Sequence, residues 1–167
     1  EGGNVQGSTG TISLYVDDVV IRQQPAVVAV LASDFEANMD GWYSWGSEIG
    51  LSTAVVHGGA QSLAVTDATV GKAVVQMSSL LEPGETYDVS YWVTIGGADS
   101  ASINVTNTAD CGDGPQYVWI ASRQTVTAGA WTELTGSYTV PEGCTLVDAQ
   151  FYVEGGDLLN PTDTVTL

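Results

Sequence analysis

Flat aromatic rings and carboxylates alternate with apolar residues in two segments of the chain. Apolar side chains occupy every second position of residues 147–153, which is the period of a half-buried strand. The alternate side chains then face away from the core, and they are Gln150, Tyr152 and Glu154. In residues 116–122 a core position for Val118 and Ile120 likewise turns Tyr117 and Trp119 outward. Rings that stack on pyranose faces, beside polar groups that bond hydroxyls, predict a polysaccharide groove.

These aromatic side chains also have a simpler interpretation. They could pack under loops or against a neighbouring module, because large rings bury apolar area wherever they find a partner. Catalytic chemistry has almost no support. His57 is the only histidine and lies in a Gly-rich turn. The sequence therefore gives no sign of a histidine positioned as general base for a Ser-His-Asp or Cys-His arrangement. We therefore expect a protein that is not an enzyme.

The rest of the chain has the pattern of an all-β protein. Residues 86–95 alternate strictly between apolar and polar side chains, and residues 12–17 do the same. Further strands are predicted near residues 30–36, 50–56, 62–66, 72–78, 102–106, 116–122 and 132–140. Gly- and Pro-rich turns separate them, as in Glu82-Pro83-Gly84-Glu85. Many short strands of this kind predict an antiparallel β-sandwich of the jelly-roll type.

The chain is strongly acidic. It has 20 acidic residues against 3 basic ones and a formal net charge of −17. Nucleic acids and anionic membranes are bound through Lys and Arg, so we expect neither as a partner. The acidity favours an extracellular setting, with Ca²⁺ or high salt.

Two cysteines lie in loop-like surroundings. Cys111 follows Asp110 in a Gly-rich turn, and Cys144 follows Pro141-Glu142-Gly143. An even count in an acidic, Thr-rich chain favours one disulfide and an oxidising compartment. The alternative is a pair of reduced thiols in a cytosolic protein.

The two ends of the chain are near-copies of each other. Residues 1–14 and 154–167 both begin with Glu-Gly-Gly, and most of their other positions are identical or similar. Self-similarity of this kind is typical of tandem modules. We therefore expect residues 1–22 to be the final strand of a preceding module and residues 23–32 to be a linker and the start of the next one. Residues 33–167 would form a β-sandwich module that lacks its own final strand.

The missing strand should match residues 11–21, with Ile12, Leu14 and Val16 filling the core. It could come from a tandem neighbour, from a neighbouring subunit or, by circular permutation, from the start of the same chain. Either of the first two sources would join copies head to tail by strand sharing.

Short segments in the order 33–167 followed by 1–21 form a recognisable set. They are Asp34-Phe35-Glu36, Gly41-Trp42, His57-Gly58-Gly59-Ala60-Gln61-Ser62-Leu63, Leu81-Glu82-Pro83-Gly84-Glu85-Thr86-Tyr87, Trp92-Val93, Trp131-Thr132, Phe151-Tyr152-Val153-Glu154 and Tyr15-Val16-Asp17-Asp18-Val19. This ordered set resembles the carbohydrate-binding modules of families 4 and 22 over almost the whole chain. The resemblance implies a β-jelly roll. It also implies a non-catalytic module of a secreted polysaccharide hydrolase.

The resemblance further implies a structural Ca²⁺ ion. The matching positions are Asp17, Glu36 and backbone oxygens from His57 to Gln61. Ca²⁺ takes roughly six to eight oxygen ligands, so a carboxylate from each end of the module plus loop carbonyls would join the first strand to the last. The other interpretation is that both acids are ordinary surface residues.

The family also offers a ligand site. Tyr117, Tyr152 and Glu154 fall near positions that bind xylan in family 22. However, Trp45-Gly46 stands where the family has a basic residue, and the Arg and Trp of its following strand have no counterpart in residues 66–71.

Two function classes follow from these observations. Because of the repeated ends, the incomplete module and the missing groove residues, we expect a structural unit of a head-to-tail extracellular fibre or surface assembly. Its partners would be neighbouring copies of the same module, joined by strand sharing and Ca²⁺. The alternative is a carbohydrate-binding module for β-glucan or xylan in a secreted multi-modular glycoside hydrolase.

Overall fold

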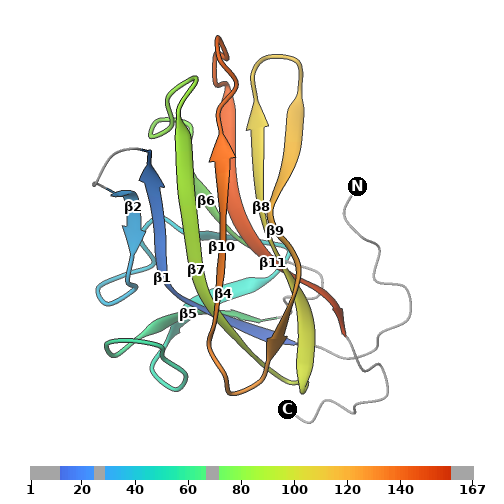
Figure 1. Ribbon diagram of the computed structural model, residues 1–167. Helices are drawn as coiled ribbons and strands as arrows, with labels where there is room; N and C mark the ends of the chain where they lie inside the picture. The colour runs from blue at the N-terminus through green and yellow to red at the C-terminus, as the bar shows by residue number, and fades with distance from the viewer. Residues whose placement is uncertain (1–11, 25–28, 67–71, 159–167) are drawn as a thin grey trace.

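The described part of the chain is made of β-strands that form two packed antiparallel sheets (Figure 1). The computed structural model describes residues 12–24, 29–66 and 72–158. The strands are β1 (Ser13–Gln23), β2 (Ala29–Ser33), β3 (Tyr43–Trp45), β4 (Glu48–Ser52), β5 (Ser62–Thr66), β6 (Lys72–Gln76), β7 (Thr86–Gly96), β8 (Ser100–Asp110), β9 (Pro115–Thr127), β10 (Thr132–Thr139) and β11 (Asp148–Leu158). The predicted all-β jelly-roll sandwich is confirmed. None of the described segments contains a helix that is long and apolar enough to span a membrane.

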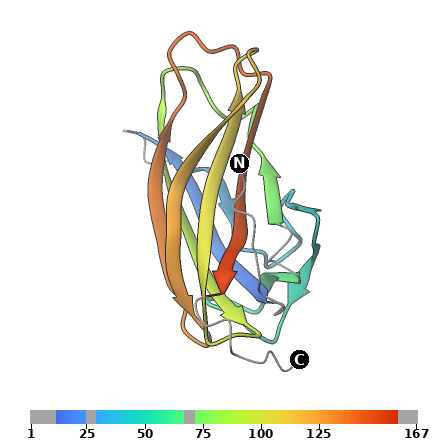
Figure 2. The same ribbon diagram turned by 90° about the vertical axis from the view of Figure 1, so that its right-hand side faces the viewer.

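Each sheet mixes strands that are far apart in the sequence. Sheet A has the strand order β10-β7-β1-β5-β4, and β2 pairs with β1 beside this path. Sheet B has the order β3-β6-β11-β8-β9, and Figure 2 shows its strands side by side with β11 in red at the centre. Strands β3 and β9 are therefore the two edges of sheet B.

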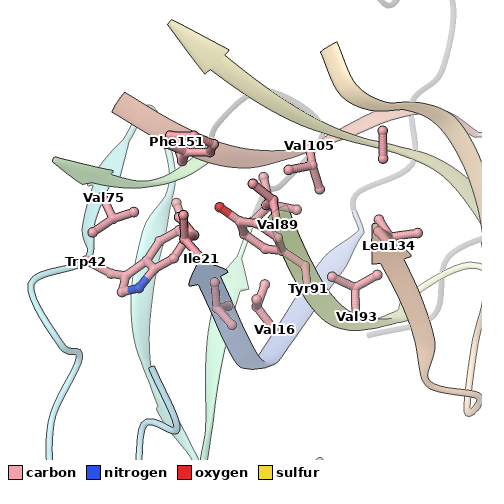
Figure 3. Close-up of a cluster of buried hydrophobic side chains, with 14 of the residues drawn as sticks. Val16, Ile21, Trp42, Val75, Val89, Tyr91, Val93, Val105, Leu134 and Phe151 are labelled. Atoms are coloured by element: carbon pink, nitrogen blue, oxygen red, sulfur yellow. The ribbon is translucent and has the colours of Figure 1, made fainter. Parts of the chain in front are cut away.

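The sandwich core follows from the alternation of apolar side chains. In β7 the buried set is Tyr87, Val89, Tyr91, Val93 and Ile95, and β11 contributes Ala149, Phe151 and Val153. Figure 3 shows part of this core, with Val89, Tyr91 and Val93 of β7 and Phe151 of β11 among the side chains between the sheets. Val147 was expected to belong to the alternating set of the last strand. It is instead 65% exposed and precedes β11, because the strand starts at Asp148.

Strand β1 lies inside the sandwich of its own chain. It pairs with β7 on one side and with β5 and β2 on the other, all antiparallel. Ile12, Leu14 and Val16 are fully buried in the core, as expected for a strand that completes the module. Of the three possible sources of this strand, the structure shows the start of the same chain. The two near-copies at the chain ends lie mostly outside the described residues. The division into residues 1–22, 23–32 and 33–167 stays a prediction.

A bulge in β1 buries an acidic residue. The register between β1 and β7 shifts between Asp17 and Val20, and Asp18 adopts a positive φ of 46°. An extra residue in one strand re-aims the side chains beside it. Val16 and Asp17 are consequently both buried although they are adjacent, and Asp17 is only 1% exposed.

Candidate functional site

The outward face of sheet B brings residues from all five strands into rows. Paired residues of antiparallel strands share a face, so the register defines each row. In the central row, Tyr43 faces Val74, Val74 faces Tyr152, Tyr152 faces Thr106, and Thr106 faces Trp119. This row runs from one edge of the sheet to the other. We call this surface the sheet B face.

Two further rows flank the central one. One row consists of Trp45, Lys72, Glu154 and Asn104. The other row consists of Gln76, Gln150, Thr108 and Tyr117. The structure therefore brings together Tyr117, Trp119, Gln150, Tyr152 and Glu154, the five residues that the sequence predicts for a saccharide site.

Exposed aromatic rings form the two ends of the sheet B face. On the edge strand β3, Tyr43 is 40% exposed and Trp45 is 63% exposed. On the opposite edge strand β9, Tyr117 is 59% and Trp119 is 60% exposed. The three central strands supply a polar floor between these walls. Four interstrand spacings separate β3 from β9, about 19 Å along a flat sheet.

Tyr152 differs from its expected role. Only 3% of this residue is exposed, so its ring belongs to the floor and does not offer a stacking surface. The ammonium group of Lys72 covers the ring, with its nitrogen 3.8 Å from the ring centroid. Burial, together with the nearby charge of Glu154, raises the pKa of Tyr152 to about 12. Its hydroxyl therefore stays protonated at physiological pH.

Lys72 and Glu154 form a partly buried pair of opposite charges on this floor. They face each other across the β6–β11 ladder. Burial lowers the pKa of Lys72, and the charge of Glu154 opposes this effect. Burial likewise raises the pKa of Glu154, and the charge of Lys72 opposes it. Because the Lys72 nitrogen also lies 4.3 Å from the Trp45 ring centroid, the ammonium is held between two aromatic rings.

Three residues of the sheet B face, Tyr43, Trp45 and Lys72, are not among the site residues predicted from the sequence. No strand is predicted at β3, which is only three residues long. The signal was present in Tyr43-Ser44-Trp45, where two rings alternate with one small polar residue and so share one face. Nothing in the sequence near Lys72 indicates that its partner is Trp45, because only the register of β3 on β6 brings them together.

The predicted metal ligands converge on one loop. The Asp17 carboxylate accepts hydrogen bonds from the backbone N–H groups of His57 and Gly58, at 3.0 and 3.3 Å. The Glu36 carboxylate accepts from the N–H groups of Ala60 and Gln61, at 2.9 and 3.1 Å. Burial raises the pKa of Asp17, and the backbone hydrogen bonds oppose this shift.

The side chains of the loop have other partners. The His57 ring lies 2.8 Å from the Asp18 carboxylate through Nδ1 and stacks on Trp92 at a centroid distance of 4.1 Å. The side-chain amide of Gln61 donates to the backbone carbonyl of Glu36 at 2.8 Å. Both side chains therefore have partners within the protein.

The donor chemistry of this loop partly fits Ca²⁺. The carboxylates of Asp17 in β1 and of Glu36 after β2 meet at the loop of residues 57–61. Carboxylate and carbonyl oxygens are the ligands that Ca²⁺ prefers. In this conformation, however, backbone N–H groups occupy oxygens of both carboxylates. Within residues 12–24, 29–66 and 72–158, no cluster of three or more His, Cys, Asp or Glu side chains could hold a metal ion. Calcium binding at Asp17 and Glu36 stays a prediction.

The predicted disulfide is confirmed. Cys111 and Cys144 are bonded, with their Cα atoms 5.2 Å apart and a sequence separation of 33. The bond links the turn between β8 and β9 to the connection between β10 and β11. It therefore braces the end of sheet B near Tyr117.

Comparison with known proteins identifies the family to which this chain belongs. Residues 28–164 match the family described as "Carbohydrate binding domain". The endo-1,4-beta-xylanase A of Thermotoga neapolitana is 32% identical over 156 residues, which cover 89% of this chain and 14% of that protein. The chain thus spans about one seventh of that relative.

Solved structures have the same fold. The CBM22-1 xylan-binding domain of Paenibacillus barcinonensis Xyn10C has a TM-score of 0.68 at 22% identity, covering 77% of this chain and 85% of that one. The C-terminal family 22 carbohydrate binding module of Clostridium thermocellum Xyn10B has a TM-score of 0.62 at 25% identity, with 78% and 83% covered.

The prediction that the chain is a structural unit of a fibre or surface assembly is wrong. The relatives found are xylanases and their xylan-binding domains, and the strand that would have joined neighbouring copies lies in the sandwich of its own chain. The resemblance to carbohydrate-binding modules, in contrast, is confirmed. The chain belongs to the carbohydrate binding domain family, with a family 22 type β-sandwich.

Proposed function

We propose that this chain is a non-catalytic xylan-binding module of a secreted, multi-domain xylanase. The observation that carries the proposal is the arrangement of the sheet B face, where exposed aromatic pairs at both edges flank a polar floor. A linear saccharide that crosses the strands would stack on Trp119 and Trp45. Its hydroxyls would meet Gln150, Glu154 and Lys72 between them.

The relatives support xylan as the ligand. The matching proteins are endo-1,4-beta-xylanases, and the matching structures are described as xylan-binding domains. The chain corresponds to a small part of those enzymes, which suits a binding module beside a separate catalytic domain. Extracellular localisation is supported by the disulfide between Cys111 and Cys144.

Isothermal titration calorimetry with xylohexaose tests this proposal. We expect Trp119→Ala and Trp45→Ala each to weaken binding about tenfold, or about 1.4 kcal/mol. Leu51→Ala is the matched control, because this exposed side chain lies on β4 of sheet A. Wild-type affinity in both tryptophan variants would show that the sheet B face is not the binding site. No heat with xylohexaose or soluble xylan would refute xylan as the ligand.

A further inference from the structure

Strands β10, β7 and β1 lie side by side in sheet A, on the other side of the sandwich from sheet B (Figure 1). A depression lies over these three strands. Its volume is about 740 Å³. Ligand pockets typically measure about 300–1,000 Å³. Its lining includes Arg22, Asp88, Ser90, Trp92, Glu133 and Thr135. We call this depression the sheet A groove.

The register of sheet A explains why polar groups gather there. Thr135 pairs with Ser90, and Ser90 pairs with Val20. Glu133 pairs with Trp92 in the next row, and Arg22 pairs with Asp88 in the row on the other side. The groove is therefore a grid of outward side chains from three adjacent strands, with a hydroxyl, a carboxylate or a guanidinium at most positions.

One end of the groove is aromatic. Trp92 is half-buried, and His57 stacks on it at a centroid distance of 4.1 Å. Trp131 packs against the same histidine at 5.4 Å and donates its indole N–H to the carbonyl of Val56 at 3.1 Å. The loop around His57 thus holds Trp92 in place and leaves part of its ring on the groove surface.

The charges of the groove restrict its ligand. The carboxylates of Asp18, Asp88 and Glu133 line it together with one guanidinium, that of Arg22. Such a lining disfavours phosphate and other anions, as does the net charge of −17. Hydroxyl groups remain well matched, because carboxylates accept their hydrogens and Arg22 donates to their oxygens.

A second, smaller depression of about 380 Å³ lies between β9 and β10, and its lining includes Trp119, Glu133 and Thr135. Trp119 belongs to the sheet B face, whereas Glu133 and Thr135 also line the sheet A groove. A long polymer on the sheet B face that extends past Trp119 would therefore reach the polar side chains of Glu133 and Thr135.

We infer that the sheet A groove binds a further segment of the same neutral polysaccharide that occupies the sheet B face. Trp92 provides the apolar contact, while Arg22, Asp88 and Glu133 bond hydroxyl groups. The inference rests on the proposed function for the identity of the polymer. It adds a second contact surface that long chains reach.

Titration of isotopically labelled protein with soluble neutral xylan tests the inference by NMR. The indole N–H signals of Trp119 and Trp92 report on the sheet B face and on the groove. We expect both signals to shift. Thr135→Arg should abolish the Trp92 shift and weaken affinity for the polymer at least threefold, while Trp119 still shifts. Leu51→Arg is the control, because it adds the same charge at an exposed position on β4 that lines neither surface.

The other outcomes separate the two proposals. A shift of Trp119 alone overturns the groove and leaves the proposed function intact. No shift of either signal refutes the proposed function as well. If the Trp92 signal still shifts in Thr135→Arg, binding in the sheet A groove is not the cause of the shift, and the inference is overturned. A Trp92 signal that moves with protein concentration before xylan is added, with a dimer in analytical ultracentrifugation, assigns the groove to a second copy of the chain.

Discussion

The ammonium nitrogen of Lys72 lies 3.8 Å from the centroid of the Tyr152 ring, at the centre of the sheet B face. The same nitrogen lies 4.3 Å from the Trp45 ring centroid. At both distances a cation is attracted to the face of the ring. Lys72 is one of only three basic residues in the chain, so its position on this floor has a direct consequence for ligand binding.

Loss of this cation should reduce xylan binding. Lys72→Met keeps an unbranched apolar stem but removes the N–H donors. We expect affinity for xylohexaose to fall about three- to tenfold, in line with about 0.5–1.5 kcal/mol for one lost hydrogen bond to a saccharide hydroxyl. Lys72→Arg should retain most of the affinity. Calorimetry provides the measurement, and equal affinity of the Met variant and wild type would exclude a role for the ammonium.

Glu154 should make binding dependent on pH. Burial raises its pKa above the ordinary 4.5, and only the ionised carboxylate accepts hydrogen bonds through both oxygens. Affinity for xylohexaose should therefore decline on acidification, with a midpoint above 4.5. Glu154→Gln should bind more weakly at neutral pH and lose this pH step. If the variant shows a pH-dependent change in affinity of the same size, a group other than Glu154 causes it.

The same shift predicts an opposite trend for stability. A carboxyl whose pKa is raised in the folded state adds stability below its unfolded pKa, and that stability is lost as the pH rises through the folded value. In urea titrations, wild type should thus lose more stability between acidic and neutral pH than Glu154→Gln does. Identical pH profiles of the two proteins would contradict the raised pKa.

Gly136 should resist substitution although it lies in a regular strand. A Cβ added at this position of β10 would collide with the backbone carbonyl oxygen and the side chain of Ile120 in β9. We expect Gly136→Ala to lower the free energy of unfolding by about 1–3 kcal/mol, because two packed strands must separate. Gly50→Ala in β4 is the control, since its Cβ would meet no atom within 4 Å. Denaturant unfolding measures both, and equal values for the two variants would disprove the close contact.

The disulfide should contribute substantially to stability. Closing the loop between Cys111 and Cys144, which have a sequence separation of 33, is worth about 3–4 kcal/mol in the chain-entropy model. Reduction of the wild type, or replacement of both cysteines by serine, should lower the denaturation midpoint accordingly. The double serine variant should then be insensitive to reductant. An unchanged midpoint in the serine variant would show that other contacts hold these turns.

Calcium should stabilise the module if the loop at residues 57–61 binds it. A ligand at a hundredfold excess over its Kd adds about 2.7 kcal/mol to the folded state. Chelation should then lower the melting temperature of the wild type, and Glu36→Gln or Asp17→Asn should remove most of that difference. The hydrogen bonds from Ala60 and Gln61 to Glu36 explain how the loop would stay attached without the ion. An unchanged melting temperature with chelator would rule out the calcium site.

The sequence by itself determined the fold class and the direction of most side chains. Alternation in residues 86–95 and 147–153 predicts most of the buried residues, although Val147 is exposed and Thr94 is buried, because a strand has a period of two and one face must pack on the core. This argument places Gln150 and Glu154 outward together, and the disulfide follows from cysteine number and context.

The tertiary structure alone decided which strands are neighbours. Alternation carries no information on pairing, so the insertion of β1 between β7 and β5, and the position of Lys72 opposite Trp45, depend on non-local registers. The tertiary structure also decided that Tyr152 is a buried residue of the sheet B face and not an exposed stacking ring. An outward side chain is exposed only where neighbouring strands leave it uncovered, and β6 brings the Lys72 ammonium over this ring.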